Sequence, residues 1–136
     1  MLIPARLFLS RLHHVVMTLA LALALGLGAV GSAAWAQDFT LYMVEQAGCI
    51  YCERWNEEVG EAYPLTAEGR AAPLQRIDLR DPIPEGVTFT RRAAFTPTFV
   101  LIKDGQEVGR LEGYAGDEFF WVLLADMLEK AGATLE

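Results

Sequence analysis

The stretch from residue 39 to residue 52 reads FTLYMVEQAGCIYC, and it is the part of the sequence that predicts the fold. Its first seven residues, Phe39–Glu45, are apolar and rich in aromatic and β-branched side chains, so they are expected to form a strand of a buried sheet. A turn follows, and Cys49 then begins a predicted helix that runs to about Ala62. The helix is predicted from apolar side chains at helical spacing, namely Tyr51, Trp55, Val59 and Ala62.

Three further strands are expected beyond this helix. They are predicted over residues 74–79, 98–103 and 106–113. A strand, a helix and a strand of these lengths predict a parallel βαβ unit with a right-handed crossover. Asp104-Gly105 is a strong signal for a β-hairpin between the last two strands. Residues 81–94 are compatible with a loop or a short helix.

A closing helix is expected over residues 117–130, and Gly132 should end it. Its predicted buried stripe consists of Phe120, Leu123, Leu124, Met127 and Leu128. The order of elements is therefore βαβ followed by ββα. This order predicts an α/β fold with a four-stranded mixed sheet and helices on its faces.

The first 36 residues have the pattern of a secretory signal peptide. Arg6 and Arg11 lie near the start, no charged residue occurs between Val15 and Gln37, and Ala34-Trp35-Ala36 forms a small-x-small site. Cleavage after Ala36 would leave one domain, residues 37–136. The alternative is an uncleaved membrane anchor, because the uncharged stretch is long enough to span a bilayer. Both interpretations place the domain outside the cytoplasm.

The composition of residues 37–136 excludes several kinds of partner and chemistry. This segment holds all 18 acidic residues and nine of the 11 basic ones, which gives a net charge of −9. Nucleic acids and anionic lipids are bound through basic surfaces, so neither is expected as a partner. Both histidines lie in the first 36 residues. The predicted domain therefore has neither a Cys–His nucleophile pair nor the usual nitrogen ligands of zinc.

Cys49 and Cys52 are the only cysteines, and they lie at the start of a predicted helix. Only a thiolate attacks a disulfide, and the N–H groups and dipole of a helix N-terminus favour the anion. Cys49 is therefore the predicted exposed nucleophile, and Cys52, one turn further, is the predicted resolving thiol. We expect no bound cofactor and no metal.

Two other interpretations of the cysteine pair remain open. The first is an inert structural disulfide, although a bridge that closes so short a loop removes little entropy from the unfolded chain. The second is a Cu(I)-binding dithiol chaperone, because two thiolates are able to hold Cu(I). No histidine and no Met-rich motif accompany the pair in residues 37–136.

The segment Phe95-Thr96-Pro97-Thr98-Phe99 places a proline directly before a predicted strand. Proline is tolerated at the start of a strand, and its peptide bond could be trans or cis. In the cis interpretation, Pro97 faces the cysteines and the backbone of Thr96 pairs with an extended substrate segment by β-augmentation. Thr96, Pro97 and Tyr51 are the predicted substrate-binding residues.

In this order and spacing, these features resemble the thioredoxin superfamily over nearly all of residues 37–136. The resemblance implies a thioredoxin fold, with Cys49 as nucleophile, Cys52 as resolving thiol and Thr96-Pro97 as the cis-proline substrate contact. More narrowly, the sequence is similar to the small periplasmic thioredoxins of bacterial sulfur-oxidation (Sox) clusters. They share the GC-x-YC site, a tryptophan-bearing helix after it and the FTPTF strand.

The sequence also departs from the thioredoxin pattern. Thioredoxins carry a buried aspartate six residues before the first cysteine, where it accepts the proton of the resolving thiol, and this position is Met43 here. Glu45 should point to the same side of the strand and lie closer to the cysteines. We therefore hypothesise that Glu45 accepts this proton. The alternative is an exposed glutamate at the end of a strand.

The combined prediction is a periplasmic thiol–disulfide oxidoreductase that keeps the cysteines of a partner protein reduced. Outside the cytosol no glutathione or thioredoxin pool restores the dithiol, so a membrane electron donor is expected to re-reduce it. A disulfide oxidase or isomerase is the alternative within the same class. A tyrosine before the second cysteine and a threonine before the proline argue weakly against a strong oxidant. No dimerisation segment is evident, so a monomer is expected.

Overall fold

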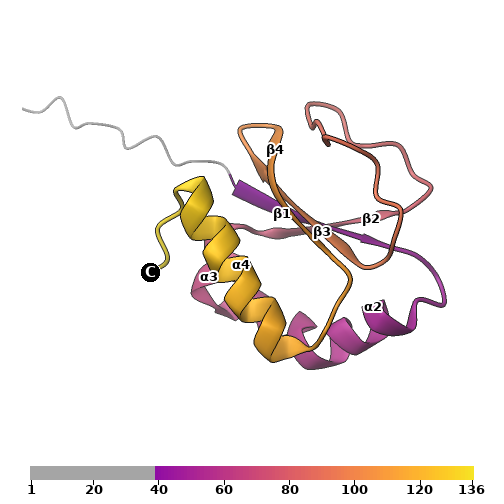
Figure 1. Cartoon of the computed structure of the whole chain (residues 1–136), viewed down its shortest axis with the longest axis horizontal. Helices are drawn as coiled ribbons and strands as arrows, with labels where there is room; N and C mark the ends of the chain where they lie inside the picture. The colour runs from indigo at the N-terminus through magenta and orange to yellow at the C-terminus, as the bar shows by residue number, and fades with distance from the viewer. Residues whose placement is uncertain (1–38) are drawn as a thin grey trace, which may run out of the picture. The chain divides into compact units, whose positions relative to one another are not determined.

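The structure is a computed structural model, and it describes residues 39–136. The fold is built on a four-stranded mixed sheet (Figure 1). The strand order is β2-β1-β3-β4. β1 (Phe39–Glu45) pairs in parallel with β2 (Leu74–Asp78) and antiparallel with β3 (Thr98–Lys103), which pairs antiparallel with β4 (Gln106–Glu112). This confirms the predicted α/β class and sheet. The predicted signal peptide and its cleavage lie outside the described residues.

The helix after the cysteines is wound differently from the prediction. α2 (Ile50–Trp55) is followed by a π-helix, η1 (Asn56–Gly60), rather than by an α-helix to Ala62. The backbone at Trp55, Asn56 and Glu61 stays in the right-handed helical region, so the winding continues while the hydrogen-bond spacing widens. A short 3₁₀-helix, η2 (Tyr63–Leu65), and α3 (Ala67–Ala71) complete the crossover to β2.

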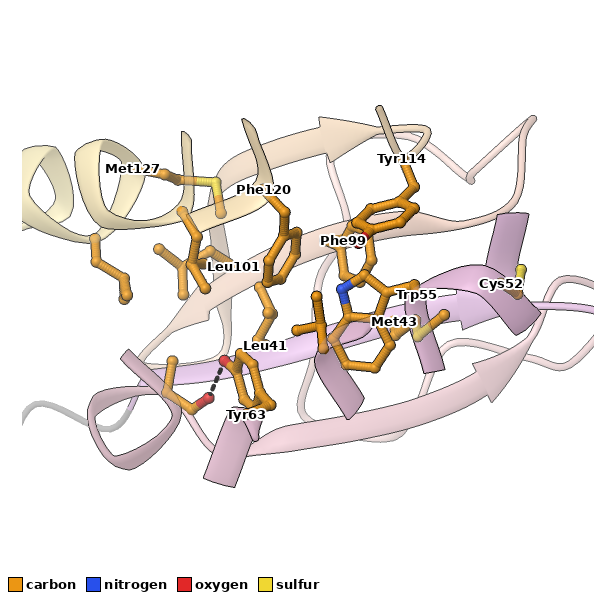
Figure 2. Packing of buried hydrophobic residues seen from close by; sticks show 14 of the residues in the cluster. Leu41, Met43, Cys52, Trp55, Tyr63, Phe99, Leu101, Tyr114, Phe120 and Met127 are labelled. Carbon is orange, nitrogen blue, oxygen red and sulfur yellow. Dashed lines mark hydrogen bonds between the residues drawn. The ribbon is translucent and has the colours of Figure 1, made fainter. Parts of the chain in front are cut away.

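One face of the sheet packs against the helices around an aromatic core, which Figure 2 shows from close by. The Trp55 ring lies 5.4 Å from Phe99 of β3 and 5.6 Å from Phe120 of α4 (Asp117–Ala131), measured between ring centroids. The Tyr63 hydroxyl donates to the carbonyl of Ala72 at 2.7 Å. Cys52 lies at one end of this core, so the packing of α2 fixes the position of the second cysteine.

The other face of the sheet is covered by the long connection between β2 and β3. A smaller apolar cluster there contains Phe89 of this connection together with Val44, Val100 and Ile102 of the sheet. Residues 81–94, which the sequence left open, form a loop. The loop is joined to the β3–β4 hairpin, because the Thr88 N–H donates to the Gly105 carbonyl at 2.8 Å. Thr96 and Pro97 lie at the end of this connection, immediately before β3.

α4 (Asp117–Ala131) closes the fold close to its predicted bounds. Its buried side chains are Phe120, Leu124, Met127 and Leu128. The expectation that Leu123 is buried is wrong, because 47% of this residue is exposed. The core-facing line runs through residues 120, 124, 127 and 128, and Leu123 lies at its edge, where it borders a surface groove.

The β3–β4 hairpin has the turn that its sequence predicts. Asp104 and Gly105 have φ angles of 50° and 79°, as the two central residues of a type I′ turn require.

Among residues 39–136, no helix is long and apolar enough to cross a membrane.

Candidate active site

The two cysteines form a disulfide at the start of α2. Their Cα atoms are 5.2 Å apart. Cys49 occupies the N-cap position, and its sulfur accepts a hydrogen bond from the Cys52 N–H at 3.1 Å. The exposed fractions are 8% for Cys49 and 3% for Cys52, so both are largely buried in the disulfide form and Cys49 is the more accessible. The same N–H group would stabilise a thiolate on Cys49 after reduction.

The loop that carries Thr96 and Pro97 is tied to the elements around it. The Thr96–Pro97 peptide bond is cis. The Gln46 side-chain amide donates to the Thr96 hydroxyl at 3.1 Å, and the Gly113 N–H donates to the Pro97 carbonyl at 2.8 Å. The loop is therefore fixed to the segment between β1 and the cysteines on one side and to the end of β4 on the other.

A polar cavity of about 400 Å³ lies beside the disulfide and is lined by both cysteines. Arg76 of β2 donates from Nη1 to the Glu45 carboxylate at 2.8 Å and from Nη2 to the Asn56 side-chain oxygen at 2.7 Å. Its guanidinium also lies 5.5 Å from the centre of the Trp55 ring. The other charged residues lining the cavity are Glu53, Asp78 and Asp81.

This cavity is where the structure places the predicted Glu45. The side chain of Glu45 is 28% exposed and lines the same cavity as Cys52. Met43, two residues earlier, is fully buried, with its sulfur 3.6 Å from Arg76 Nη1. Glu45 is therefore the carboxylate of β1 that lies on the cysteine side of the sheet, and Arg76 holds it there.

A second hollow, the apolar groove, lies between the cis-proline loop and α4. It has a volume of about 730 Å³. The residues that line it are Tyr51, Phe95, Thr96, Arg110, Leu111, Glu112, Gly113, Tyr114, Ala115, Phe119, Phe120 and Leu123. Two of the predicted substrate-binding residues, Tyr51 and Thr96, therefore border one surface, while Pro97 is buried behind it.

One wall of the apolar groove is held by Tyr114. Its hydroxyl donates to Glu58 of η1 at 2.6 Å, and Arg54 Nε donates to the other oxygen of Glu58 at 2.8 Å. Burial and the bond to Glu58 raise the pKa of Tyr114, and the bonds from Tyr114 and Arg54 hold the pKa of Glu58 below its usual range. The hydroxyl and the carboxylate therefore keep this donor–acceptor pairing at neutral pH.

The sequence interpretation did not identify Gln46, Asn56, Arg76 or Tyr114. Arg76 could have been found from the parallel pairing of β1 and β2, which places it opposite Met43. No local pattern indicates the bond between Tyr114 and Glu58, since 56 residues separate them. Within residues 39–136, no three His, Cys, Asp or Glu side chains are grouped so that they could hold a metal ion.

Comparison with known proteins defines the class. The family model for the thioredoxin-like domain matches residues 29–128, so the chain belongs to the thioredoxin-like family. This fold and the Cys49–Cys52 pair make the protein a thiol–disulfide oxidoreductase.

The chain is also similar to a protein of known structure. The chain is similar to the crystal structure of the periplasmic thioredoxin SoxS from Paracoccus pantotrophus in its reduced form. The two sequences are 53% identical, and the TM-score is 0.68. The match covers 69% of this chain and 99% of the other. No curated protein matches the sequence. The predicted resemblance to the thioredoxins of sulfur-oxidation clusters is confirmed.

Proposed function

We propose that the protein is a periplasmic reductase that keeps the cysteines of a partner protein in the thiol form. The observation that carries the proposal is the position of Glu45, whose carboxylate lines the cavity that Cys52 also lines. A reductase must deprotonate its second thiol to release the substrate, and a carboxylate within reach, directly or through one water, is suited to accept that proton. The similarity to a periplasmic thioredoxin supports both the compartment and the class.

The proposed reaction has two exchange steps. The Cys49 thiolate attacks one sulfur of the substrate disulfide, and the other substrate sulfur leaves as a thiolate. Glu45 then takes the proton of the Cys52 thiol, and the Cys52 sulfur attacks the sulfur of Cys49. This forms the Cys49–Cys52 disulfide and releases the second substrate thiolate. Two electrons pass from the protein dithiol to the substrate.

Activity also requires that the protein binds its substrate, reaches the periplasm and has its disulfide reduced again. Tyr51 and Thr96 contact the substrate, the buried Pro97 holds the loop in place, and the free backbone groups of Thr96 pair with the extended chain of the substrate. Residues 1–36 export the protein and are removed after Ala36. A membrane electron donor re-reduces the disulfide, because no cytosolic thiol pool reaches this compartment. The protein acts as a monomer.

The test uses the protein purified after export, with insulin as a model disulfide substrate. We expect the reduced wild-type protein to accelerate the reduction of insulin by dithiothreitol. Cys52→Ser should accumulate a mixed disulfide with insulin that dithiothreitol dissolves, since the second exchange step is blocked. Cys49→Ser should form none. A Cys49→Ser variant as active as the wild type would contradict the assignment of the nucleophile.

A further inference from the structure

Gln46 is hydrogen-bonded to both halves of the redox site. Its backbone carbonyl accepts a hydrogen bond from the Cys49 N–H at 3.3 Å, and its side-chain amide donates to the Thr96 hydroxyl at 3.1 Å. Gln46 and Thr96 are 50 residues apart in the sequence, so only the folded chain brings them together. Gln46 also lines the polar cavity beside the two cysteines. One residue therefore joins the turn before the cysteines to the cis-proline loop.

The tip of this turn, which spans residues 46–49, is open to solvent. Ala47 and Gly48 are exposed, whereas Gln46 is half-buried. Gly48 has a φ angle of 73°, and a Cβ built on it would meet no atom within 4 Å outside the adjacent residues. Packing therefore gives the tip little support. The bond from Gln46 to Thr96 is thus a main constraint on where the turn lies relative to the cis-proline loop.

The cis-proline loop is fixed on its other side by bonds that do not reach the cysteines. The Gly113 N–H donates to the Pro97 carbonyl at 2.8 Å, which joins the loop to the end of β4. The Thr98 hydroxyl donates to the Phe95 carbonyl at 2.8 Å, which holds the curvature of the loop itself. The bond from Gln46 supplies the connection to the cysteine side of the site.

Disulfide exchange with an extended chain requires a defined distance between these two parts of the site. In the proposed function, the substrate backbone pairs with Thr96 while Cys49 attacks the substrate sulfur. Reacting groups that are held in line react fast, and a misplacement of about 1 Å can cost about a hundredfold in rate. A bond that fixes Thr96 relative to Cys49 should therefore matter for substrates that have a backbone to align.

We propose that Gln46 is a positioning residue, which holds Thr96 at the distance from Cys49 at which a paired substrate chain presents its disulfide to the thiolate. The inference rests on the proposed function and adds to it a residue that takes no part in the exchange of sulfur or protons. Gln46 acts through Thr96, so the loss of either partner of the bond should have the same effect, and losing both should cost little more than losing one.

The test compares disulfides that release the same coloured thionitrobenzoate anion when they react with the reduced, exported protein. One is a short peptide whose single cysteine is linked to thionitrobenzoate. The other is dithiobis-nitrobenzoate, which has no backbone to align. In both reactions the Cys49 thiolate attacks one sulfur, and thionitrobenzoate leaves with the electron pair of the broken bond. A third substrate, the same peptide with N-methylated amides, lacks the N–H groups that strand pairing uses.

Gln46→Ala should slow the reaction with the peptide by about tenfold but change the rates with the other two disulfides by less than about twofold. Gln46→Asn, whose amide is one methylene too short to reach Thr96, should behave in the same way. Thr96→Val should slow the peptide to a similar extent, and the double variant should be little slower than either. Gln75→Ala is the matched control, because Gln75 is exposed on β2 and does not line the polar cavity. Circular dichroism checks the fold of each variant.

The outcomes separate the two proposals. If dithiobis-nitrobenzoate does not react with the wild-type dithiol, the proposed function fails. If it reacts but Gln46→Ala slows all three disulfides equally, the role of Gln46 is merely structural and only the positioning inference is overturned. The same holds if Gln46→Ala leaves the peptide rate unchanged, if Gln75→Ala loses as much, or if the losses from Gln46→Ala and Thr96→Val multiply in the double variant.

Discussion

Glu45 and Arg76 are the residues through which the polar cavity would act on Cys52. Their side chains are joined at 2.8 Å, and Arg76 is fixed in turn by Asn56 at 2.7 Å. A carboxylate accepts a proton in its ionised form, and Arg76 fixes where the Glu45 carboxylate lies. In the proposed mechanism the two residues therefore have different roles, with Glu45 as the proton acceptor and Arg76 as the residue that positions it.

Glu45→Gln should slow the release of substrate by about tenfold to a hundredfold near neutral pH, because an amide does not accept the Cys52 proton. The rate should recover as the pH rises and the thiol ionises without help. The measurement is the rate of insulin reduction against pH. Glu57→Gln is the control, since Glu57 is exposed on η1 and does not line the cavity. Superimposable profiles for Glu45→Gln and wild type would rule out the proton relay.

Arg76→Gln should change the same pH profile in the same direction but by a smaller factor, about threefold to tenfold, because Glu45 remains but loses its anchor. Arg76→Lys should recover part of the loss, since it keeps the charge but not the two-pronged geometry. A purely structural role for Arg76 would instead lower the stability and leave the shape of the profile unchanged. Thermal unfolding of each variant separates these results.

The candidate site residues that the sequence indicates are those whose arrangement is local. Cys49 and Cys52 lie one helical turn apart, and Thr96-Pro97 immediately precedes a strand, so their spacing, together with the resemblance to thioredoxins, indicated them as candidates. Arg76 and Tyr114 could not be predicted in the same way. Their partners Glu45 and Glu58 are 31 and 56 residues away, and only the folded chain brings them together.

At the scale of elements, periodicity predicted the strands and α4 well. It failed at the edge of a helical face, where Leu123 has the spacing of a core residue but borders the apolar groove. It also missed the π-helical continuation of α2, because the same right-handed backbone supports either hydrogen-bond spacing. The connection over residues 79–97 has no period, since its role is to cover one face of the sheet with scattered side chains such as Phe89.

Two glycines in the crossover from α2 to β2 should respond in opposite ways to alanine. A Cβ on Gly69 would lie 1.8 Å from the Tyr63 carbonyl oxygen, so Gly69→Ala must displace backbone and should destabilise the protein by roughly 3 kcal/mol. A Cβ on Gly60 meets nothing closer than 3.7 Å, so Gly60→Ala should stabilise by up to about 1 kcal/mol. Urea unfolding measures both. Equal effects of the two changes would contradict this packing.

At the scale of the whole domain, a buried ion pair within β4 is hydrogen-bonded to the loop that leads to the cis-proline. The Glu107 and Arg110 side chains are 8% and 7% exposed, and Glu107 also accepts from the Thr90 N–H at 2.7 Å. Burial raises the pKa of Glu107, but the bonds from Arg110 and Thr90 outweigh it and hold this pKa below its usual range. The ionised carboxylate is therefore favoured in the folded state.

The direction of this pKa shift determines how the stability of the folded protein depends on pH. A carboxyl whose folded pKa is depressed stabilises the protein above its unfolded pKa, and the stability is lost as the pH falls through the folded value. Glu107→Gln should cost about 3 kcal/mol at neutral pH, because it removes the carboxylate bonded to the buried Arg110 and leaves that arginine only the longer pair with Glu112 at 3.7 Å. Below pH 4 the difference from wild type should shrink. Asp126→Asn, which breaks an exposed pair with Lys130, is the control. A difference that does not change with pH would contradict the pairing.

The reduction potential of the Cys49–Cys52 pair tests the central claim most directly. The exported protein is equilibrated in thiol buffers of known potential, and the fraction of disulfide is measured. If the protein is a reductase, we expect a reduction potential near the thioredoxin level of about −270 mV. A value between about −180 and −120 mV would instead indicate an isomerase or oxidant. A disulfide that resists reduction well below about −300 mV would be structural and would contradict the redox role.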